Sequence, residues 1–260
     1  MRRFVLIAAI AVLAVPAAAH TTASPYLHTF VCRPSLYPGQ RTVSVTAVMP
    51  TLPDTQKLQM RFQLESFAAG QALAIRGGDL GHWISPHPIT LGQQPADVWI
   101  VRHPVTGVVV PATYRFKVTF RWIGSGGHIL SQTTRTGPAC RQPDLRPDLF
   151  VRSITVQPAA GGVDRYAAVI GNDGLTAATG VEVLFRPGGG AAAQTATIPR
   201  VRPHIDRTVS FVGPACTTAT APTITVDPYD QIDDLNRANN SMAATCPAVP
   251  AARARQAKLK

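Results

Sequence analysis

Strict alternation of apolar and polar residues is the feature of this sequence that most restricts its fold. In residues 114–122, aromatic residues and Val alternate with Arg, Lys and Thr. The same period of two recurs in residues 58–65 and 42–47. Successive side chains of a β-strand point to opposite faces of the sheet, so each segment predicts a strand. We expect the aromatic stripe of residues 114–122 to lie in a core, with binding as the alternative wherever part of it is exposed.

Turn-forming residues separate these segments along the whole chain. The sequence has 23 Pro and 20 Gly, and it shows no long segment with a helical period of 3.6 after its first twenty residues. Residues 27–32 and 97–101 are further strand candidates, and Gly124–Gly127 indicates a hairpin leading into residues 128–136. Short antiparallel strands joined by tight turns are typical of a β-sandwich. The predicted fold class is therefore all-β.

The second half of the chain repeats this pattern with turn signals about every ten residues, as in immunoglobulin-like sandwiches. We expect Gly174, in an Asn-Asp-Gly turn, to adopt a positive φ. A seventh strand is expected within residues 239–246, and the other six candidates are residues 149–156, 166–170, 181–185, 193–198, 208–212 and 223–226.

The first nineteen residues have the pattern of a secretory signal peptide. Arg2 and Arg3 precede an apolar run over residues 4–15, and Pro16 is followed by three Ala that suit a cleavage site. We expect cleavage near Ala19 and a secreted product, extracellular or in the cell envelope. The alternative is an uncleaved anchor, although twelve apolar residues fall short of the roughly 20 that span a bilayer. No later run has spanning length, so no transmembrane segment is expected in the mature chain.

Four cysteines follow the predicted cleavage site, and an even number in an exported chain favours disulfides. Four cysteines allow three pairings. Pairing within each half would join Cys32 to Cys140 and Cys216 to Cys246. A metal site is the alternative, but these spacings lack the closely spaced ligand pairs of zinc sites.

A Pro-rich segment at residues 142–147 predicts a linker between two domains. The domain boundaries expected from it are a signal peptide at 1–19, a β-sandwich at 25–141, a second sandwich at 148–247 and a disordered tail at 248–260. Lys and Arg outnumber Asp and Glu by 25 to 14, and four of the cations lie in the tail. That tail is either merely solvated or attached to anionic polymer or lipid headgroups.

Short motifs of the second half occur in a recognisable order. Pro147-Asp148-Leu149 opens it, Asn172-Asp173-Gly174 follows a strand, and Val226-Asp227-Pro228, Ile232-Asp233-Asp234 and Asn239-Asn240 end it. Over about residues 147–246 this order resembles CARDB, the cell-adhesion-related domain found in bacteria. The resemblance implies an immunoglobulin-like sandwich on exported proteins, used for binding or spacing more than for catalysis. Three features depart from the family pattern: Asp233 or Asp234 stands where Glu is usual, Arg237 stands where an acid is common, and Cys216 and Cys246 are additions to the general pattern. The first half is only generically immunoglobulin-like.

The acidic segment Asp227–Asn240 offers oxygen ligands of the kind that calcium prefers, although its spacing is not that of an EF-hand. The alternative, which we favour, is a wide turn in which Asp and Asn side chains accept backbone N–H groups. His82, His87 and His103 fall in an irregular region and are expected to be scattered loop residues without a zinc site. No metal ligand or cofactor-binding residue is therefore assigned.

Catalytic motifs are not recognisable, and no catalytic residue is assigned. The two Glu, Glu65 and Glu182, fall in different predicted domains, so they do not form the carboxylate pair of a glycosidase. We expect an exported non-catalytic binding or adhesion module. Its partner would be an unidentified envelope polymer, glycan or extracellular protein, with no nucleic acid. The alternatives are a structural spacer or accessory subunit of an envelope assembly, and an enzyme with an unrecognised site in residues 67–95.

Overall fold

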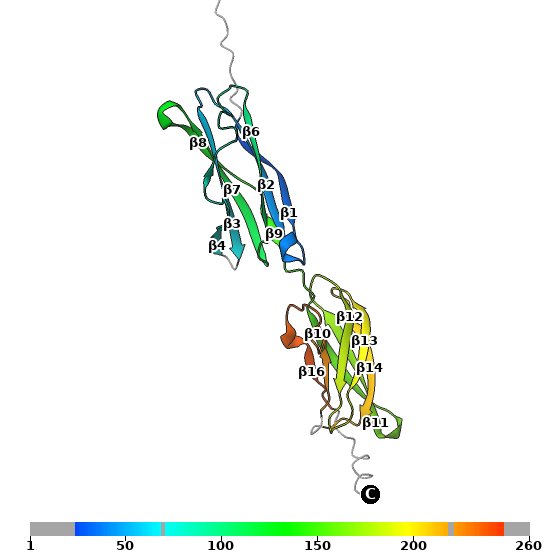
Figure 1. The fold of residues 1–260 in the computed structure, drawn as a ribbon. Coiled ribbons are helices and arrows are strands. Elements are labelled where there is room, and N and C mark those ends of the chain that lie inside the picture. Colours follow the sequence, from blue (N-terminus) through cyan, green and yellow to red (C-terminus); the bar gives the residue numbers. More distant parts are fainter. Residues whose placement is uncertain (1–23, 69–70, 218–220, 247–260) are drawn as a thin grey trace, which may run out of the picture. The chain divides into compact units, whose positions relative to one another are not determined.

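The computed structural model describes residues 24–68, 71–217 and 221–246 (Figure 1). The predicted signal peptide at 1–19 and the predicted tail at 248–260 lie outside these residues and remain predictions. Strands dominate the described chain, and the helical segments are single 3-10 turns. These turns are η1 (Pro38–Gln40), η2 (Ser125–Gly127), η3 (Ala160–Gly162) and η5 (Arg237–Asn239). The predicted all-β class is confirmed.

Within the described residues, nine strands build the N-terminal sandwich from two sheets. One sheet has the order β1-β2-β6, and the other has the order β4-β3-β7-β8, with β5 paired to β3 and β9 paired to β7. Their bounds are β1 (Tyr26–Arg33), β2 (Thr42–Pro50), β3 (Lys57–Ala68), β4 (Gln71–Ile75), β5 (Trp83–Ile84), β6 (Val98–Thr106), β7 (Ala112–Ile123), β8 (Ile129–Thr136) and β9 (Cys140–Gln142).

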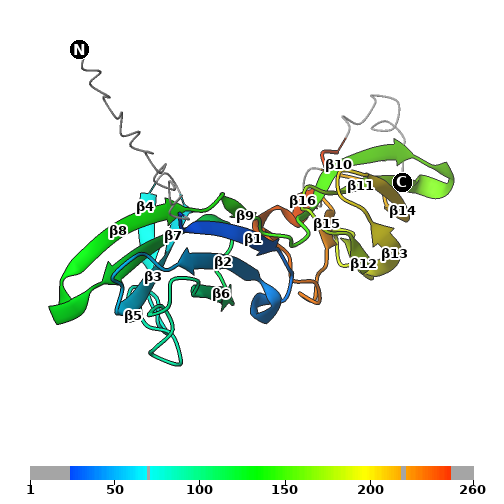
Figure 2. The same ribbon diagram turned by 90° about the horizontal axis from the view of Figure 1, so that it is seen from above.

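The alternating segments place their apolar residues in the core of this sandwich. Tyr114 and Trp122, at the two ends of the aromatic stripe, are almost fully buried, as are the apolar residues between them. The Trp122 indole donates a hydrogen bond of 2.8 Å to the Pro50 carbonyl, which satisfies its one polar atom in the core. The stripe is therefore core and not a binding surface. The predicted hairpin is also present, because β7 and β8 pair antiparallel around η2 and run side by side in Figure 2.

Seven strands build the C-terminal sandwich. Its sheets have the orders β10-β11-β14 and β13-β12-β15-β16. Phe185 and Tyr166 face each other across its core with ring centroids 4.8 Å apart, and Phe211 stacks on Phe185 at 5.1 Å. The strand bounds are β10 (Leu149–Pro158), β11 (Val163–Asn172), β12 (Ala178–Arg186), β13 (Gln194–Val201), β14 (Arg207–Pro214), β15 (Thr223–Val226) and β16 (Ser241–Ala243). Each of the seven predicted strand regions overlaps one of them.

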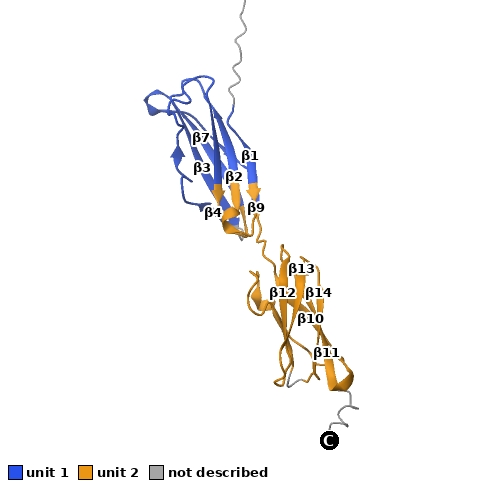
Figure 3. Ribbon diagram, turned by 45° about the vertical axis from the view of Figure 1, so that its right-hand side comes forward, with its two compact units in different colours: residues 1–31, 44–104, 114–140 blue, residues 32–43, 105–113, 141–260 orange. Residues whose placement is uncertain are grey.

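The chain divides into two compact units, coloured separately in Figure 3. The first contains the described residues up to 31 together with 44–104 and 114–140. The second contains 32–43, 105–113 and the described residues from 141 onward. The domain boundaries expected from the sequence, 25–141 and 148–247, remain predictions.

Residues 67–95, the irregular region of the sequence, contain short strands and a long loop, as expected. β4 pairs with β3 at the end of that strand, and Trp83 of β5 lies opposite Arg61 of β3. The two short strands therefore extend the same edge of the sheet, one after the other.

Candidate functional site

The motifs that resemble CARDB meet at one end of the C-terminal sandwich, around the segment by which the chain enters it. The backbone N–H of Asp148 donates to the Asn172 side chain, and the N–H of Leu149 donates to the Asp234 carboxylate, both at 3.0 Å. The Asn239 amide in turn donates to the Asp148 carboxylate at 3.0 Å. Three motifs far apart in the sequence thus hold the same two residues of the entry segment.

Asn172 is the centre of this arrangement and is fully buried. Its amide nitrogen donates to the carbonyls of Thr176 and Val201, at 2.9 and 3.2 Å. Its amide oxygen accepts the N–H of Gly174 as well as that of Asp148. One Asn side chain therefore satisfies four backbone groups, which an apolar residue at this position would leave unpaired.

Gly174 does not have the positive φ that the turn motif predicts, so that expectation is wrong. Its requirement is space. A Cβ atom on Gly174 would lie 2.5 Å from the nitrogen of Asp148 and 2.6 Å from the carbonyl carbon of Pro147, and it would also meet the Arg146 carbonyl oxygen. The turn after Asn172 packs directly on the backbone of the entry segment, and only Gly allows this approach.

The two buried carboxylates of the acidic loop are occupied by backbone N–H groups. Asp227 accepts from Gln231 and Ile232, each at 3.0 Å. Asp234 accepts from Asn236 at 2.9 Å in addition to its bond with Leu149. These contacts match the favoured interpretation, in which residues 227–240 form a wide turn held by local hydrogen bonds from backbone N–H groups to Asp side chains.

Two arginines, Arg237 and Arg146, form ion pairs with acidic groups at this end of the domain. Arg237 forms ion pairs with Asp230 and Asp227, and it donates to the Ile232 carbonyl at 2.6 Å. The cation that departs from the family pattern therefore holds the loop together. Sequence reasoning recorded Arg237 only as a departure, although a cation within a run of acids was the available signal.

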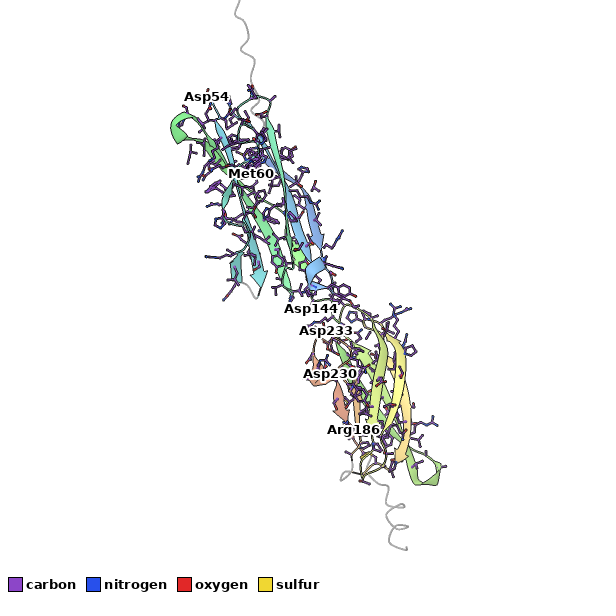
Figure 4. The ribbon with its side chains drawn as sticks, viewed as in Figure 1. Asp54, Met60, Asp144, Arg186, Asp230 and Asp233 are labelled. Carbon is purple, nitrogen blue, oxygen red and sulfur yellow. A yellow bond between two sulfur atoms is a disulfide. The ribbon has the colours of Figure 1, made fainter. Side chains whose placement is uncertain are left out.

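Arg146 makes a similar link between the Pro-rich segment and the acidic loop. It contacts Asp144 at 2.9 Å and Asp233 at 3.3 Å. These hydrogen bonds from Arg146 lower the pKa of the Asp144 carboxyl, and the same bonds raise the pKa of the Arg146 guanidinium. In Figure 4, Asp144, Asp233 and Asp230 lie at the end of the domain that holds the acidic loop, and Arg186 lies toward its other end.

The possible calcium site of residues 227–240 finds no further support in this geometry. Within the described residues, no group of three or more His, Cys, Asp or Glu side chains is arranged to hold a metal ion. The loop carboxylates bind N–H groups and guanidinium groups of the chain itself.

The cysteines are oxidised. Cys216 and Cys246 form a disulfide, so the predicted bond within the second half is confirmed. Cys32 and Cys140 are also disulfide-bonded. Two disulfides fit an oxidising environment. Across the described ranges, no helix has the length and apolar character needed to cross a membrane.

A hollow lies beside the N-terminal sandwich at the edge formed by β4 and β5. It has a volume of about 340 Å³, and its lining includes the side chains of Gln63, Arg76 and His82. Both titratable side chains of this lining are basic. The structure thus places His82 at a concave surface, whereas His87 lies on the exposed loop.

His103 is not a loop residue, so its predicted setting is wrong. It lies in β6, is buried, and stacks on Phe62 with ring centroids 4.6 Å apart. Burial lowers the pKa of the His103 imidazole, and Asp79, at 3.4 Å, opposes that effect. Pro104 after His103 predicts a loop, but β6 continues through both residues to Thr106.

Two of the solved structures that match this chain are distantly similar to it. Red sea bream transglutaminase is 10% identical, with 85% of this chain and 31% of that chain covered and a TM-score of 0.31. Native alpha-2-macroglobulin from Escherichia coli, in its MG0-NIE-MG1 segment, is 9% identical, with 85% and 71% covered and a TM-score of 0.23. The chain thus spans about a third of the length of the transglutaminase. Among curated proteins, none matches the chain.

A family model does match the domain whose motifs meet at the entry segment. The match covers residues 146–244, which include the Pro-Asp-Leu opening, Asn172, Gly174 and the whole acidic loop. The resemblance expected from the sequence is therefore confirmed over nearly the same residues. The family model that matches these residues, 146–244 in the C-terminal half of the chain, is that of CARDB, and we refer to this part of the chain as the CARDB domain.

Proposed function

We propose that the chain is an exported, non-catalytic binding or adhesion module that acts at the cell envelope or outside the cell. The CARDB match over residues 146–244 carries this proposal, because that family is described as adhesion-related and bacterial. The disulfides support export, since cytosolic thiols are normally kept reduced. The signal-peptide pattern of residues 1–19 supports it from the sequence.

Buried carboxylates of the CARDB domain form hydrogen bonds within the chain itself, and this also supports a binding module over an enzyme. Two of the domain's buried carboxylates, those of Asp227 and Asp234, are held by backbone N–H groups. A general acid or base needs a carboxylate free to exchange a proton with a substrate. These carboxylates instead stabilise the fold that presents the rest of the surface.

The test is saturable binding of the exported chain to envelope material of the source bacterium. Export comes first: the mature protein should begin near residue 20 and should fractionate with the envelope or the medium. The purified protein, added at increasing concentration to washed envelope fractions, should then saturate. A chain retained in the cytosol with residues 1–19 intact, or binding that never saturates, would refute the proposal.

A structural spacer or accessory subunit is the alternative role, and the arginine link between Asp144, Arg146 and Asp233 favours it. This link holds residues 144 and 146 against the acidic loop within the second unit, and such internal use of charge suits a structural role. A spacer would bind no glycan or protein of the envelope saturably, so the same titration separates the two roles.

The hollow at β4 and β5 is the one observation that bears on an enzyme in residues 67–95. Its lining offers an imidazole from His82 and a guanidinium from Arg76. Two basic groups suit the recognition of an anion. Proton transfer instead needs an acid and a base whose surroundings set their pKa values apart. We therefore retain the non-catalytic assignment as the proposal, and turnover lost on substitution of His82 would overturn it.

A further inference from the structure

The solvent-facing side of the sheet β4-β3-β7-β8 carries a group of cations around one indole ring. Trp83 of β5 lies opposite Arg61 of β3 in the strand register. The Arg121 guanidinium lies 3.7 Å from the centroid of the Trp83 ring, and the Arg61 guanidinium lies 4.9 Å from it. Two positive charges therefore share one aromatic ring at this end of the sheet.

The same face continues along β3 and β7. Lys117 pairs with Glu65 at 2.9 Å, and Arg115 lies over Phe67 at 5.6 Å. At about 3.4 Å per residue, the distance from Arg115 to Arg121 along β7 is roughly 20 Å. We call Arg61, Arg115, Lys117 and Arg121, with Trp83 and Phe67, the basic row.

Charge on the basic row is largely uncompensated. Lys117 has its partner in Glu65, whereas Arg61, Arg115 and Arg121 form no ion pair with any described residue. The Nε atom of Arg61 is buried and, within the described part of the chain, has no hydrogen-bond partner. Like charges held close together repel each other, so an anion bound between Arg61 and Arg121 would stabilise both.

The hollow described above adjoins the basic row, because Gln63 of β3 lines it and lies between Arg61 and Glu65 on the same face. Arg76 and His82 add basic groups to its wall. Gln132 lies next to Arg121 and accepts its Nε–H at 2.9 Å. Amide side chains thus accompany the cations, and amides can bond hydroxyl groups in either direction.

We propose that the basic row and the adjoining hollow bind an extended anionic polysaccharide that carries carboxylate groups. This inference rests on the proposed function and names its ligand class and its surface. The guanidinium groups of Arg61, Arg115 and Arg121 pair with carboxylates, Gln63 and Gln132 bond sugar hydroxyls, and one sugar enters the hollow beside Arg76 and His82.

A polysaccharide fits this surface better than nucleic acid does. The amides of Gln63 and Gln132 match the many hydroxyl groups of a glycan. Trp83 is covered by two guanidinium groups and offers little free ring for a base to stack on, whereas stacking on aromatic rings dominates single-strand recognition. The disulfides also indicate an oxidising compartment.

The test uses the full exported chain and three probes: alginate oligosaccharides, neutral dextran and single-stranded DNA. We expect calorimetric titration to detect alginate binding that weakens as salt is raised, and no dextran binding. The double variant R61Q/R121Q should bind alginate about a hundredfold more weakly, at roughly tenfold for each lost charge-assisted hydrogen bond.

The matched control is R165Q/R200Q, which removes the same charge from two exposed arginines of the C-terminal sandwich. It should bind alginate like the natural chain. Arg115 is exposed, so R115Q provides a second test should R61Q/R121Q fail to fold, with a tenfold loss expected. The tail is unchanged in every variant, so its charges do not contribute to the differences.

Three results would overturn the inference: no alginate binding by the natural chain, equal losses in R61Q/R121Q and R165Q/R200Q, or tighter binding of DNA that the same double variant abolishes. The envelope titration separates this inference from the proposed function. Saturable envelope binding that R61Q/R121Q leaves intact would refute the basic row alone. If the natural chain shows no saturable binding to the envelope, the proposed function itself is refuted.

Discussion

Asp233 and Asp234 are sequence neighbours with the same charge and opposite surroundings. The Asp234 side chain is buried and accepts backbone N–H groups from Leu149 and Asn236. The Asp233 side chain is 83% exposed and meets only Arg146, at 3.3 Å. Loss of a buried acceptor leaves its donors unsatisfied, whereas loss of an exposed ion pair costs little.

We therefore predict that Asp234→Ala lowers the free energy of unfolding of the CARDB domain by about 3 kcal/mol. Asp233→Ala, the matched control, should lower it by less than about 0.5 kcal/mol. Urea unfolding followed by far-UV circular dichroism measures both. Equal effects of the two variants would show that the buried hydrogen bonds of Asp234 do not stabilise the domain.

His103 gives a pH dependence whose sign follows from its burial. Burial lowers the pKa of its imidazole from the ordinary value of 6.5, so the unfolded chain binds the proton more tightly. Stability of the N-terminal sandwich should therefore be complete above about pH 6.5 and should fall as the pH drops below that value. Tryptophan fluorescence during urea unfolding at several pH values measures this slope.

The control for this prediction is His103→Phe, which keeps an aromatic ring beside Phe62 and removes the titrating group. The slope between pH 7.5 and pH 5 should become shallower in the variant, whatever its absolute stability. A slope unchanged by the substitution would assign the pH dependence to other groups.

The burial of a side chain could be predicted from the sequence only where a periodic pattern assigns it to one face of a strand. The alternation of residues 114–122 correctly predicted a buried stripe, because period two fixes the face of each side chain. The Pro that follows His103 predicts a loop, whereas the structure places His103 in β6. The hydrogen bond between Leu149 and Asp234 joins residues that are far apart in the sequence, and no local pattern encodes such a pair.

At the scale of elements, the turn after β11 shows how a motif can be correct while its assumed cause is wrong. The Asn-Asp-Gly turn was predicted, but Gly174 is required for close approach to the backbone of Pro147 and Asp148. A substitution there should be costly, because backbone atoms cannot move aside as the end of a flexible side chain can.

We predict that Gly174→Ala destabilises the CARDB domain by about 3 kcal/mol or more, as severe overpacking does. Gly39→Ala is the matched control, since a Cβ atom there meets nothing within 4 Å. Its effect should lie within about 0.5 kcal/mol. Thermal unfolding of the two variants measures the difference, and a fully stable Gly174→Ala chain would contradict the packing argument.

The strands were predictable as elements because turns of Gly, Pro and Asn separate the alternating segments. Their assignment to sheets was not, because pairing depends on contacts between distant segments. The basic row illustrates the difference. Its cations on β3 and β7 appear in the sequence as the polar half of two alternations, but only the sheet brings Arg61 and Arg121 onto the Trp83 ring.

At the scale of the whole molecule, the distribution of tryptophan allows the two sandwiches to be followed separately. Trp83, Trp99 and Trp122 all belong to the N-terminal sandwich, and the CARDB domain has no tryptophan. Tryptophan fluorescence therefore reports unfolding of one sandwich, while far-UV circular dichroism reports the strands of both.

The Cys216–Cys246 disulfide closes a loop with a sequence separation of 30 residues within the CARDB domain. By loop-closure entropy, its removal in C216S/C246S should lower the free energy of unfolding by about 3–4 kcal/mol. If the two predicted domains fold independently, this loss appears only in the circular dichroism transition, and the tryptophan transition keeps its midpoint. An equal shift of both transitions would mean that the sandwiches unfold as one cooperative unit and that the boundary near residues 142–147 does not separate folding units.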